Sequence, residues 1–226
     1  MAKPLSADVR LKVEGLLLIG FGYKARRGKD TAIRSILDAR GQGKDVRRYA
    51  FADALRDEVH ETMRSVSHSY GLTYRGALER MCKSAGVQYD TNAPADEQNP
   101  HGKQRALLQW WGTEFRRASD PLYWLKRMRE RIEADGPNVA LISDVRFFNE
   151  FEMIRSAGGC MVRVEREGFE VEAPVAQHVS ERELDALRDS DWDATIWALD
   201  GDLEELRIGA VEVFDTIAAR YEHRAR

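Results

Sequence analysis

The stretch GLLLIGFGYKARRGKDT, residues 15–31, decides the fold of this chain. Its first part, Gly15 to Gly20, is apolar without alternation, which is typical of a strand buried on both faces of a parallel sheet. Apolar residues then recur at helical spacing at Ile33, Ile36 and Leu37. We therefore predict a buried strand, a glycine-rich loop and a helix in direct succession.

Four further segments favour strands, and helical patterns separate them. The strand candidates are 46–52, 139–143, 160–164 and 194–199, and the helical candidates are 53–66, 103–132 with a break at 118–121, 151–157 and 203–221. This alternation predicts an α/β fold in which a parallel sheet of about five strands is covered by helices on both faces.

The same pattern predicts one domain over residues 1–226, with its core at about 13–66 and 103–221. Apolar residues become sparse at about 67–104, and residues 91–100 are rich in loop formers, which indicates an insertion. A polar, glycine-bearing segment at about 165–185 is a candidate lid.

Composition excludes several classes of function. The 226 residues include 35 basic and 38 acidic ones, for a net charge of -3, so stable nucleic-acid binding is not expected. The apolar run at residues 15–22 is far shorter than the roughly 20 residues of a membrane helix, so we expect no membrane association and a cytoplasmic chain. Cys82 and Cys160 lack metal-ligand spacing and are interpreted as reduced thiols without a functional role.

The loop between the first strand and its helix carries the chemistry of a phosphate site. Glycine lets a phosphate approach the backbone, the helix N-terminus is positive, and Lys29 can reach the terminal phosphate oxygens. The usual phosphate-loop pattern has four residues between its glycines, whereas five separate Gly22 and Gly28, and Asp30 stands between the lysine and Thr31. A plain glycine turn with a solvated lysine is the alternative. We expect the ATP-binding residues to be Gly22, Lys24, Arg27, Gly28, Lys29, Asp30 and Thr31.

Asp144 and Arg146 follow the strand predicted at 139–143, at the sheet edge where open α/β folds bind ligands. Because magnesium keeps several waters and takes few protein ligands, Thr31 or Asp30 could orient it, and Asp144 is a further candidate ligand. Asp30 remains an alternative to Thr31. For Asp144 the alternative is a helix cap or a turn.

A set of arginines, with an amide and an aromatic residue, indicates a second, acceptor site. An arginine fork fits a phosphate, while an amide and an aromatic ring can read and stack a base. Adjacent Trp110 and Trp111 cannot share a helix face, so at least one of them packs in the core. For Asp53 the alternative is a helix cap. The substrate-binding candidates are Asp53, Arg56, Arg105, Gln109, Trp111, Arg116, Arg117 and Arg146.

Arg163 and Arg166 lie near the end of the strand predicted at 160–164, beside the candidate lid. Lids supply arginines to a transferring phosphoryl group, and plain surface charge is the alternative. His178 is interpreted as part of a helix start, with no catalytic role. We expect the catalytic groups to be Lys29, Asp144, Arg146, Arg163 and Arg166.

Several segments together resemble the deoxynucleoside monophosphate kinases of tailed bacteriophages, a branch of the P-loop nucleotide kinases. They are Gly28–Thr31, Phe51–Arg56, Leu108–Arg117, Ser143–Glu150 and His178–Glu181, in this order. The resemblance implies a P-loop three-layer fold and transfer of the γ-phosphate of ATP to a deoxynucleoside monophosphate, with Mg²⁺. It also implies that Arg146 holds the acceptor phosphate, and that the enzyme serves phage DNA precursor synthesis in the host cytoplasm.

Two other functions stay open at this point. One is a P-loop kinase that phosphorylates a modified base, of the hydroxymethyluracil type, in phage DNA, which would require a longer basic groove. The other is a nucleotide-binding regulator without turnover, although arginines placed for a second phosphate argue against it. The sequence does not fix the accepted base, the lid arginines that act, or the choice between a monomer and a homodimer.

Overall fold

Five strands form one parallel sheet in this computed structural model, which describes residues 9–11, 13–41, 45–96, 99, 101–169 and 182–225. The strand order is β2-β3-β1-β4-β5. The strands are β1 (Leu17–Gly22), β2 (Val46–Tyr49), β3 (Val139–Val145), β4 (Cys160–Glu167) and β5 (Ala194–Leu199). The predicted α/β class with an all-parallel, five-stranded sheet is confirmed, and it is compatible with a P-loop three-layer fold.

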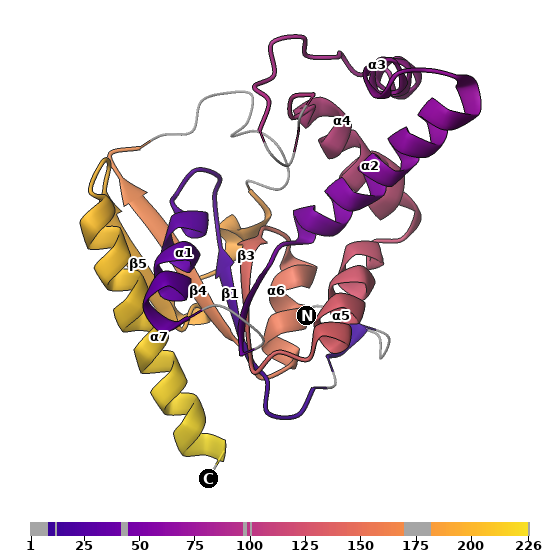
Figure 1. Cartoon of the computed structure of the whole chain (residues 1–226). Helices are drawn as coiled ribbons and strands as arrows, with labels where there is room; N and C mark the ends of the chain where they lie inside the picture. Colours follow the sequence, from indigo (N-terminus) through magenta and orange to yellow (C-terminus); the bar gives the residue numbers. More distant parts are fainter. Residues whose placement is uncertain are drawn as a thin grey trace. The chain divides into compact units, whose positions relative to one another are not determined.

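The central strand β1 is buried along its whole length, as its unbroken apolar run predicts. Alternate side chains of a strand point to opposite faces, so Leu17, Ile19 and Phe21 pack on one side. Figure 1 shows α1 (Lys29–Arg40) and α7 (Leu203–Ala225) on that face, with α5 (Tyr123–Asp135) and α6 (Phe148–Ser156) on the other. The two covered faces explain why the apolar run does not alternate.

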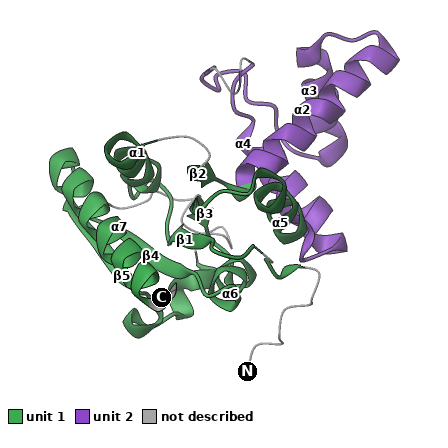
Figure 2. Cartoon of the chain, turned by 60° about the horizontal axis from the view of Figure 1, so that its bottom comes forward, with its two compact units in different colours: residues 1–51, 125–226 green, residues 52–124 purple. Residues whose placement is uncertain are grey.

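The chain divides into two compact units (Figure 2). The first comprises 1–51 and 125–226 and contains the sheet, and the second comprises 52–124. The second unit holds most of α2 (Phe51–Tyr70), together with α3 (Tyr74–Ala85), α4 (Arg105–Gln109) and the π-helix η2 (Trp110–Arg117). The insertion expected at about 67–104 lies within this unit, which also includes the segment after it.

The sheet topology creates a crevice at the carboxyl ends of β1 and β3. After β1 the chain enters α1 on one face, and after β3 it enters α6 on the other face. Two neighbouring parallel strands whose connections leave in opposite directions form the place where open α/β sheets bind ligands. In none of the described helices does an apolar stretch reach the length required to span a bilayer.

Tight packing between β1 and the turn before β4 gives a test of this core. A Cβ atom added at Gly159 would lie 2.8 Å from the Leu18 carbonyl oxygen and 3.0 Å from that of Ile154. We expect Gly159→Ala to lower the free energy of unfolding by about 1–3 kcal/mol, because backbone atoms would have to move. Urea unfolding measures this change.

The matched control is Gly209→Ala within α7, where the new Cβ would meet only Ile196 Cγ2 at 3.4 Å. Here alanine removes a mid-helix glycine, so the free energy of unfolding should stay unchanged or rise by up to about 1 kcal/mol. Equal stability of the two variants would contradict the packing described for Gly159.

Candidate functional site

A cleft of about 420 Å³ opens in the first unit at the carboxyl ends of the strands. Its walls come from the loop after β1, the ends of β3 and β4, and the turn between β5 and α7. It brings together many of the site residues expected from the sequence, namely Arg27, Gly28, Lys29, Asp30, Thr31, Asp144, Arg146 and Arg166.

Lys29 is the first residue of α1, and its side chain turns back into its own loop. The residue is only 6% exposed, and its Nζ donates hydrogen bonds to the carbonyl oxygen of Tyr23, at 3.3 Å, and to that of Lys24. Buried ammonium groups require such partners. The loop therefore holds this positive charge at the helix N-terminus, where an anion is favoured.

The loop reaches this shape through unusual backbone angles. Gly28 has a φ of +95°, and Tyr23 and Arg26 also have positive φ values, of +89° and +58°. Such angles strain residues with side chains and persist where the surroundings enforce them, often at functional sites. At Gly28 a Cβ would also lie 2.7 Å from Leu206 Cδ2, so glycine is required there for two reasons.

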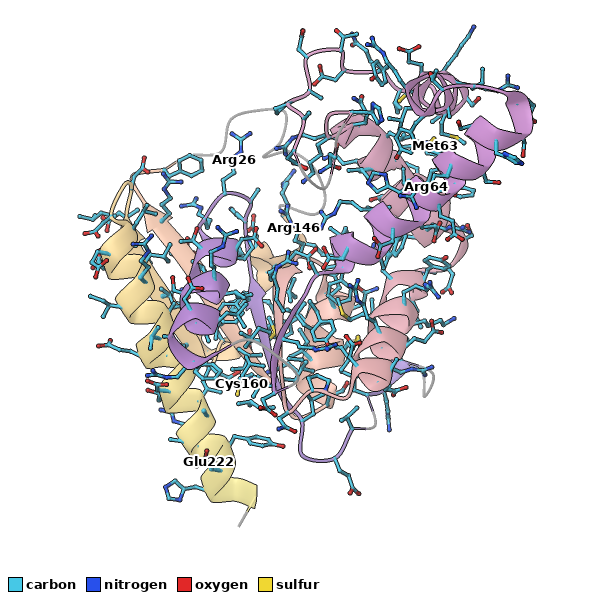
Figure 3. The ribbon with its side chains drawn as sticks, viewed as in Figure 1. Arg26, Met63, Arg64, Arg146, Cys160 and Glu222 are labelled. Carbon is cyan, nitrogen blue, oxygen red and sulfur yellow. The ribbon has the colours of Figure 1, made fainter. Side chains whose placement is uncertain are left out.

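Asp144 and Arg146 lie at the end of β3 and line the same cleft. One carboxylate oxygen of Asp144 accepts the backbone N–H of Phe51 at 2.8 Å, so the helix-capping alternative is realised, for the first residue of α2. Buried Glu150 accepts the backbone N–H of Arg146 at 2.8 Å and thereby fixes the turn after the strand. Figure 3 shows Arg26 and Arg146 at the same end of the sheet.

The cleft has an excess of positive charge. Five basic residues and three acidic ones line it: Arg26, Arg27, Lys29, Arg146 and Arg166 against Asp30, Asp144 and Asp202. In a chain of net charge -3, this local excess favours an anionic ligand.

Arg166 links the end of β4 to the glycine-rich loop between β1 and α1. Its guanidinium donates to the carbonyl oxygen of Arg26 at 3.3 Å and forms an ion pair with Asp200. The same group lies 4.5 Å from the ring centre of Phe169. In return, Arg27 donates to the Arg166 carbonyl oxygen at 2.5 Å. Arg166 is therefore anchored at the rim of the cleft.

Three residues expected in the site lie outside the cleft lining. At Gly22 a Cβ would meet the ring of Trp192 at 2.8 Å, so this glycine makes room for a core side chain. Lys24 forms an ion pair with Asp185 at 3.2 Å; burial lowers the pKa of Lys24, but the hydrogen bonds with Asp185 and Tyr23 leave it raised. Arg163 pairs with Asp189 at 2.8 Å. Their placement does not favour the expected roles of Lys24 and Arg163.

Glu58 organises the segment of the second unit that we expected to bind the acceptor. Its Oε1 accepts hydrogen bonds from the indole N–H of Trp111, at 2.7 Å, and from Arg116 Nε, at 2.6 Å, while Oε2 accepts from the Tyr123 hydroxyl. Burial raises the pKa of Glu58, but these three donors outweigh it and lower the pKa overall. Sequence reasoning missed Glu58 because its partners lie more than fifty residues further along the chain.

The two adjacent tryptophans have different environments. Trp111 is only 4% exposed, which argues against base stacking by this residue. Trp110 is partly exposed and stacks on Phe115 with ring centres 5.5 Å apart and nearly parallel planes. Accessible aromatic surface in this segment therefore belongs to Trp110 and Phe115. Both lie in the π-helix η2, a rare element that is frequent at functional sites.

The other acceptor-side candidates also belong to the second unit. Asp53 and Arg56 form an ion pair with each other. Arg105 and Gln109 are exposed on α4, and Arg117 is half-buried at the end of η2. His178, with the rest of the segment His178–Glu181, lies outside the described residues, as does most of the candidate lid.

The cleft offers groups suited to a phosphate-bound Mg²⁺. Thr31 and Asp144 both line it, together with Ser143, whose buried Oγ has no hydrogen-bond partner among the described residues. The described residues contain no cluster of three or more His, Cys, Asp or Glu side chains able to hold a metal. A magnesium ion held mainly by phosphates and water needs no such cluster, so the residues fit the expected ion.

Comparison with protein-family models and with curated proteins finds no match to this chain.

The cluster around Glu58 predicts a pH-dependent contribution to stability. At pH 7, Glu58→Gln should lower the free energy of unfolding by about 1–2 kcal/mol, because Arg116 loses a charged acceptor. A lowered pKa in the folded state means that this stabilisation is present above the unfolded pKa, about 4.3, and is lost as pH falls through the folded pKa. Urea unfolding at pH 7 and at pH 3 measures the change.

Glu61→Gln, at an exposed position of the same helix, is the control and should change stability by less than about 0.5 kcal/mol at either pH. A destabilisation of Glu58→Gln that stays equally large at pH 3 would contradict the charged state assigned to Glu58.

Proposed function

We propose that this protein is an ATP-dependent kinase that phosphorylates deoxynucleoside monophosphates. The observation that carries the proposal is the meeting of Lys29, at the N-terminus of α1, with Asp144 and Arg146 in one positively charged cleft. The cleft lies at the carboxyl ends of two neighbouring strands whose connections leave on opposite faces. Together with the sequence resemblance, this arrangement favours phosphoryl transfer between two nucleotides.

The donor side of the proposed reaction uses the loop before α1. Its backbone and the helix N-terminus bind the phosphates of ATP, and Lys29 neutralises the terminal oxygens. The phosphates would carry less effective negative charge with magnesium bound, which is the chemistry that the ion would supply here. Thr31 and Asp144 are the residues of this chain that would hold it. Ala198, Leu203 and Leu206 give the cleft an apolar surface suited to a base.

The acceptor side of the proposed reaction begins at Arg146. Its guanidinium would bind the phosphate of the monophosphate through two hydrogen bonds. One oxygen of that phosphate would then face the γ-phosphorus of ATP. That oxygen forms the new P–O bond while the bond to the bridging β,γ-oxygen breaks, which leaves ADP and a deoxynucleoside diphosphate. The other acceptor candidates expected from the sequence stay predictions, namely Asp53, Arg56, Arg105, Gln109, Arg116 and Arg117.

The first test of this function is turnover. With Mg²⁺-ATP and each common deoxynucleoside monophosphate in turn, the protein should form ADP and the matching diphosphate in equal amounts, measured by chromatography. Lys29→Ala should lower kcat/KM by about 10²–10³-fold, because it removes a charge that stabilises the transition state.

Lys83→Ala is the matched control, because Lys83 is exposed on α3 and lies outside the cleft, and this variant should retain wild-type turnover. If none of the monophosphates is phosphorylated, the proposal is wrong. ADP release without a diphosphate product would indicate an ATPase instead.

A second test separates the acceptor site from the donor site. Arg146→Lys should raise the KM for the deoxynucleoside monophosphate by roughly tenfold or more, because an ammonium cannot form two parallel hydrogen bonds to a phosphate. The KM for ATP should change much less. Initial-rate kinetics with each substrate varied in turn measures both constants.

The control for this substitution is Arg155→Lys, since Arg155 pairs with Asp193 at 2.6 Å on the first unit and does not line the cleft. It should leave both KM values unchanged. A rise in the KM for ATP alone would place Arg146 on the donor side and contradict its assignment.

A further inference from the structure

Ser143 is a buried serine whose hydroxyl makes no hydrogen bond within the described part of the chain. It lies on β3, is 2% exposed, and lines the cleft next to Asp144. Its Oγ has no hydrogen-bond partner among the residues that the structure describes. A buried hydroxyl without a partner destabilises a fold, and such groups are rare in native proteins.

The other buried side-chain atoms without a hydrogen bond in the described chain differ from Ser143 in kind. They are the Nε atoms of Arg27, Arg129 and Arg163. Each belongs to an arginine that makes an ion pair in the described structure, with Glu165, Glu133 and Asp189 respectively, and for Arg129 the Nε atom itself lies 3.5 Å from Glu133. Ser143 has only its hydroxyl, so all of its side-chain hydrogen-bonding capacity is unused. That difference makes Ser143 a candidate for binding a ligand through its hydroxyl.

The position of Ser143 on β3 indicates which ligand group it meets. Leu141, two residues earlier, packs in the cluster that contains Ala32 and Ile33 of α1. Ser143 follows where the pairing of β3 with β1 shifts register between Gly20 and Gly22, so its place is given by the cleft that it lines. The same cleft is lined by Gly28, Lys29 and Thr31 from the start of that helix. The hydroxyl therefore faces the region where helix N-terminus and lysine favour an anion.

We propose that Ser143 binds the nucleotide by donating its Oγ–H to a phosphate oxygen beside Lys29. The proposal rests on the proposed function in that the ligand is a nucleotide phosphate. A hydroxyl donor suits an anionic oxygen, and the ligand would satisfy a group that the described residues leave without a partner. Ser143 thus lowers the stability of the free protein and strengthens binding of the ligand.

The test compares stability with binding in Ser143→Ala. The nucleotide-free variant should unfold at the same temperature as the wild type or a higher one, because it removes an unsatisfied buried hydroxyl. Its Kd for ATP, measured by titration calorimetry with and without Mg²⁺, should rise roughly tenfold or more, as the loss of a hydrogen bond to a charged acceptor does. Ser143→Thr, which keeps the hydroxyl, should restore much of the affinity.

Ser156→Ala is the matched control. The Ser156 hydroxyl donates to the Met153 carbonyl oxygen at 3.0 Å on α6, outside the cleft, so its removal should not change the Kd for ATP. Adenosine, which has the same base and sugar without phosphates, is the control ligand. Its weaker binding should be equal in the wild type and in Ser143→Ala.

Three results would overturn the assignment. The first is an unchanged Kd for ATP in Ser143→Ala, and the second is a lower unfolding temperature of that nucleotide-free variant, which would show that the hydroxyl supports the fold. The third is a Ser143→Cys variant whose ATP binding is weak with Mg²⁺ but recovers with Mn²⁺ or Cd²⁺. Because thiols prefer softer metals, that recovery would place the side chain on the metal instead.

The calorimetry also separates this inference from the proposed function. If the wild type binds ATP, Ser143→Ala binds it more weakly, and no monophosphate is phosphorylated, the proposed reaction fails while the role of Ser143 stands. If the wild type phosphorylates monophosphates and Ser143→Ala binds ATP normally, only the role of Ser143 fails. A wild type that does not bind ATP would overturn both.

Discussion

The arrangement of the cleft depends on the buried ammonium group of Lys29. A charge withdrawn from water must be compensated, and here carbonyl oxygens of Tyr23 and Lys24 provide the compensation. The loop that carries these carbonyls has positive φ angles at Tyr23, Arg26 and Gly28. Carbonyl dipoles carry only partial charge, so the site keeps a positive potential. The buried charge that the loop compensates is therefore also the one that attracts an anion.

The sheet fixes the position of this loop relative to the end of β3, which lines the same cleft. Because β1 is buried between β3 and β4, its end cannot move independently of their ends. Gly22, at the end of β1, pairs with Val145 at the end of β3. Asp144, next to Val145 on β3, accepts the backbone N–H of Phe51, just before the chain passes into the second unit at Ala52. The carboxylate proposed as a magnesium ligand thus also fixes the backbone at the point where the second unit begins.

The sequence predicted what depends on local patterns. Unbroken apolar runs and helical periodicity predicted the parallel sheet. The strand, loop and helix around Lys29 lie where the pattern of residues 15–31 predicted them. Contacts between distant residues were beyond such reasoning. A sequence does not show which acidic residue forms an ion pair with a given basic residue. The ion pairs of Lys24 with Asp185 and of Arg163 with Asp189 were therefore not predicted. Two adjacent tryptophans look alike in a sequence, and only the distant acceptor Glu58 identifies Trp111 as the buried one.

The distribution of charge bears on the kind of acceptor that the cleft would take. The chain as a whole has a net charge of -3, whereas basic residues exceed acidic ones in the cleft, so the rest of the chain is net acidic. Screening limits the reach of exposed charges to about 8 Å at physiological ionic strength. The field of the cleft therefore acts on a ligand of nucleotide size. A DNA duplex would extend beyond it, toward a chain that is acidic overall, and binding a polyanion requires many phosphate contacts with basic side chains. This balance favours a free monophosphate over a base within DNA as the acceptor.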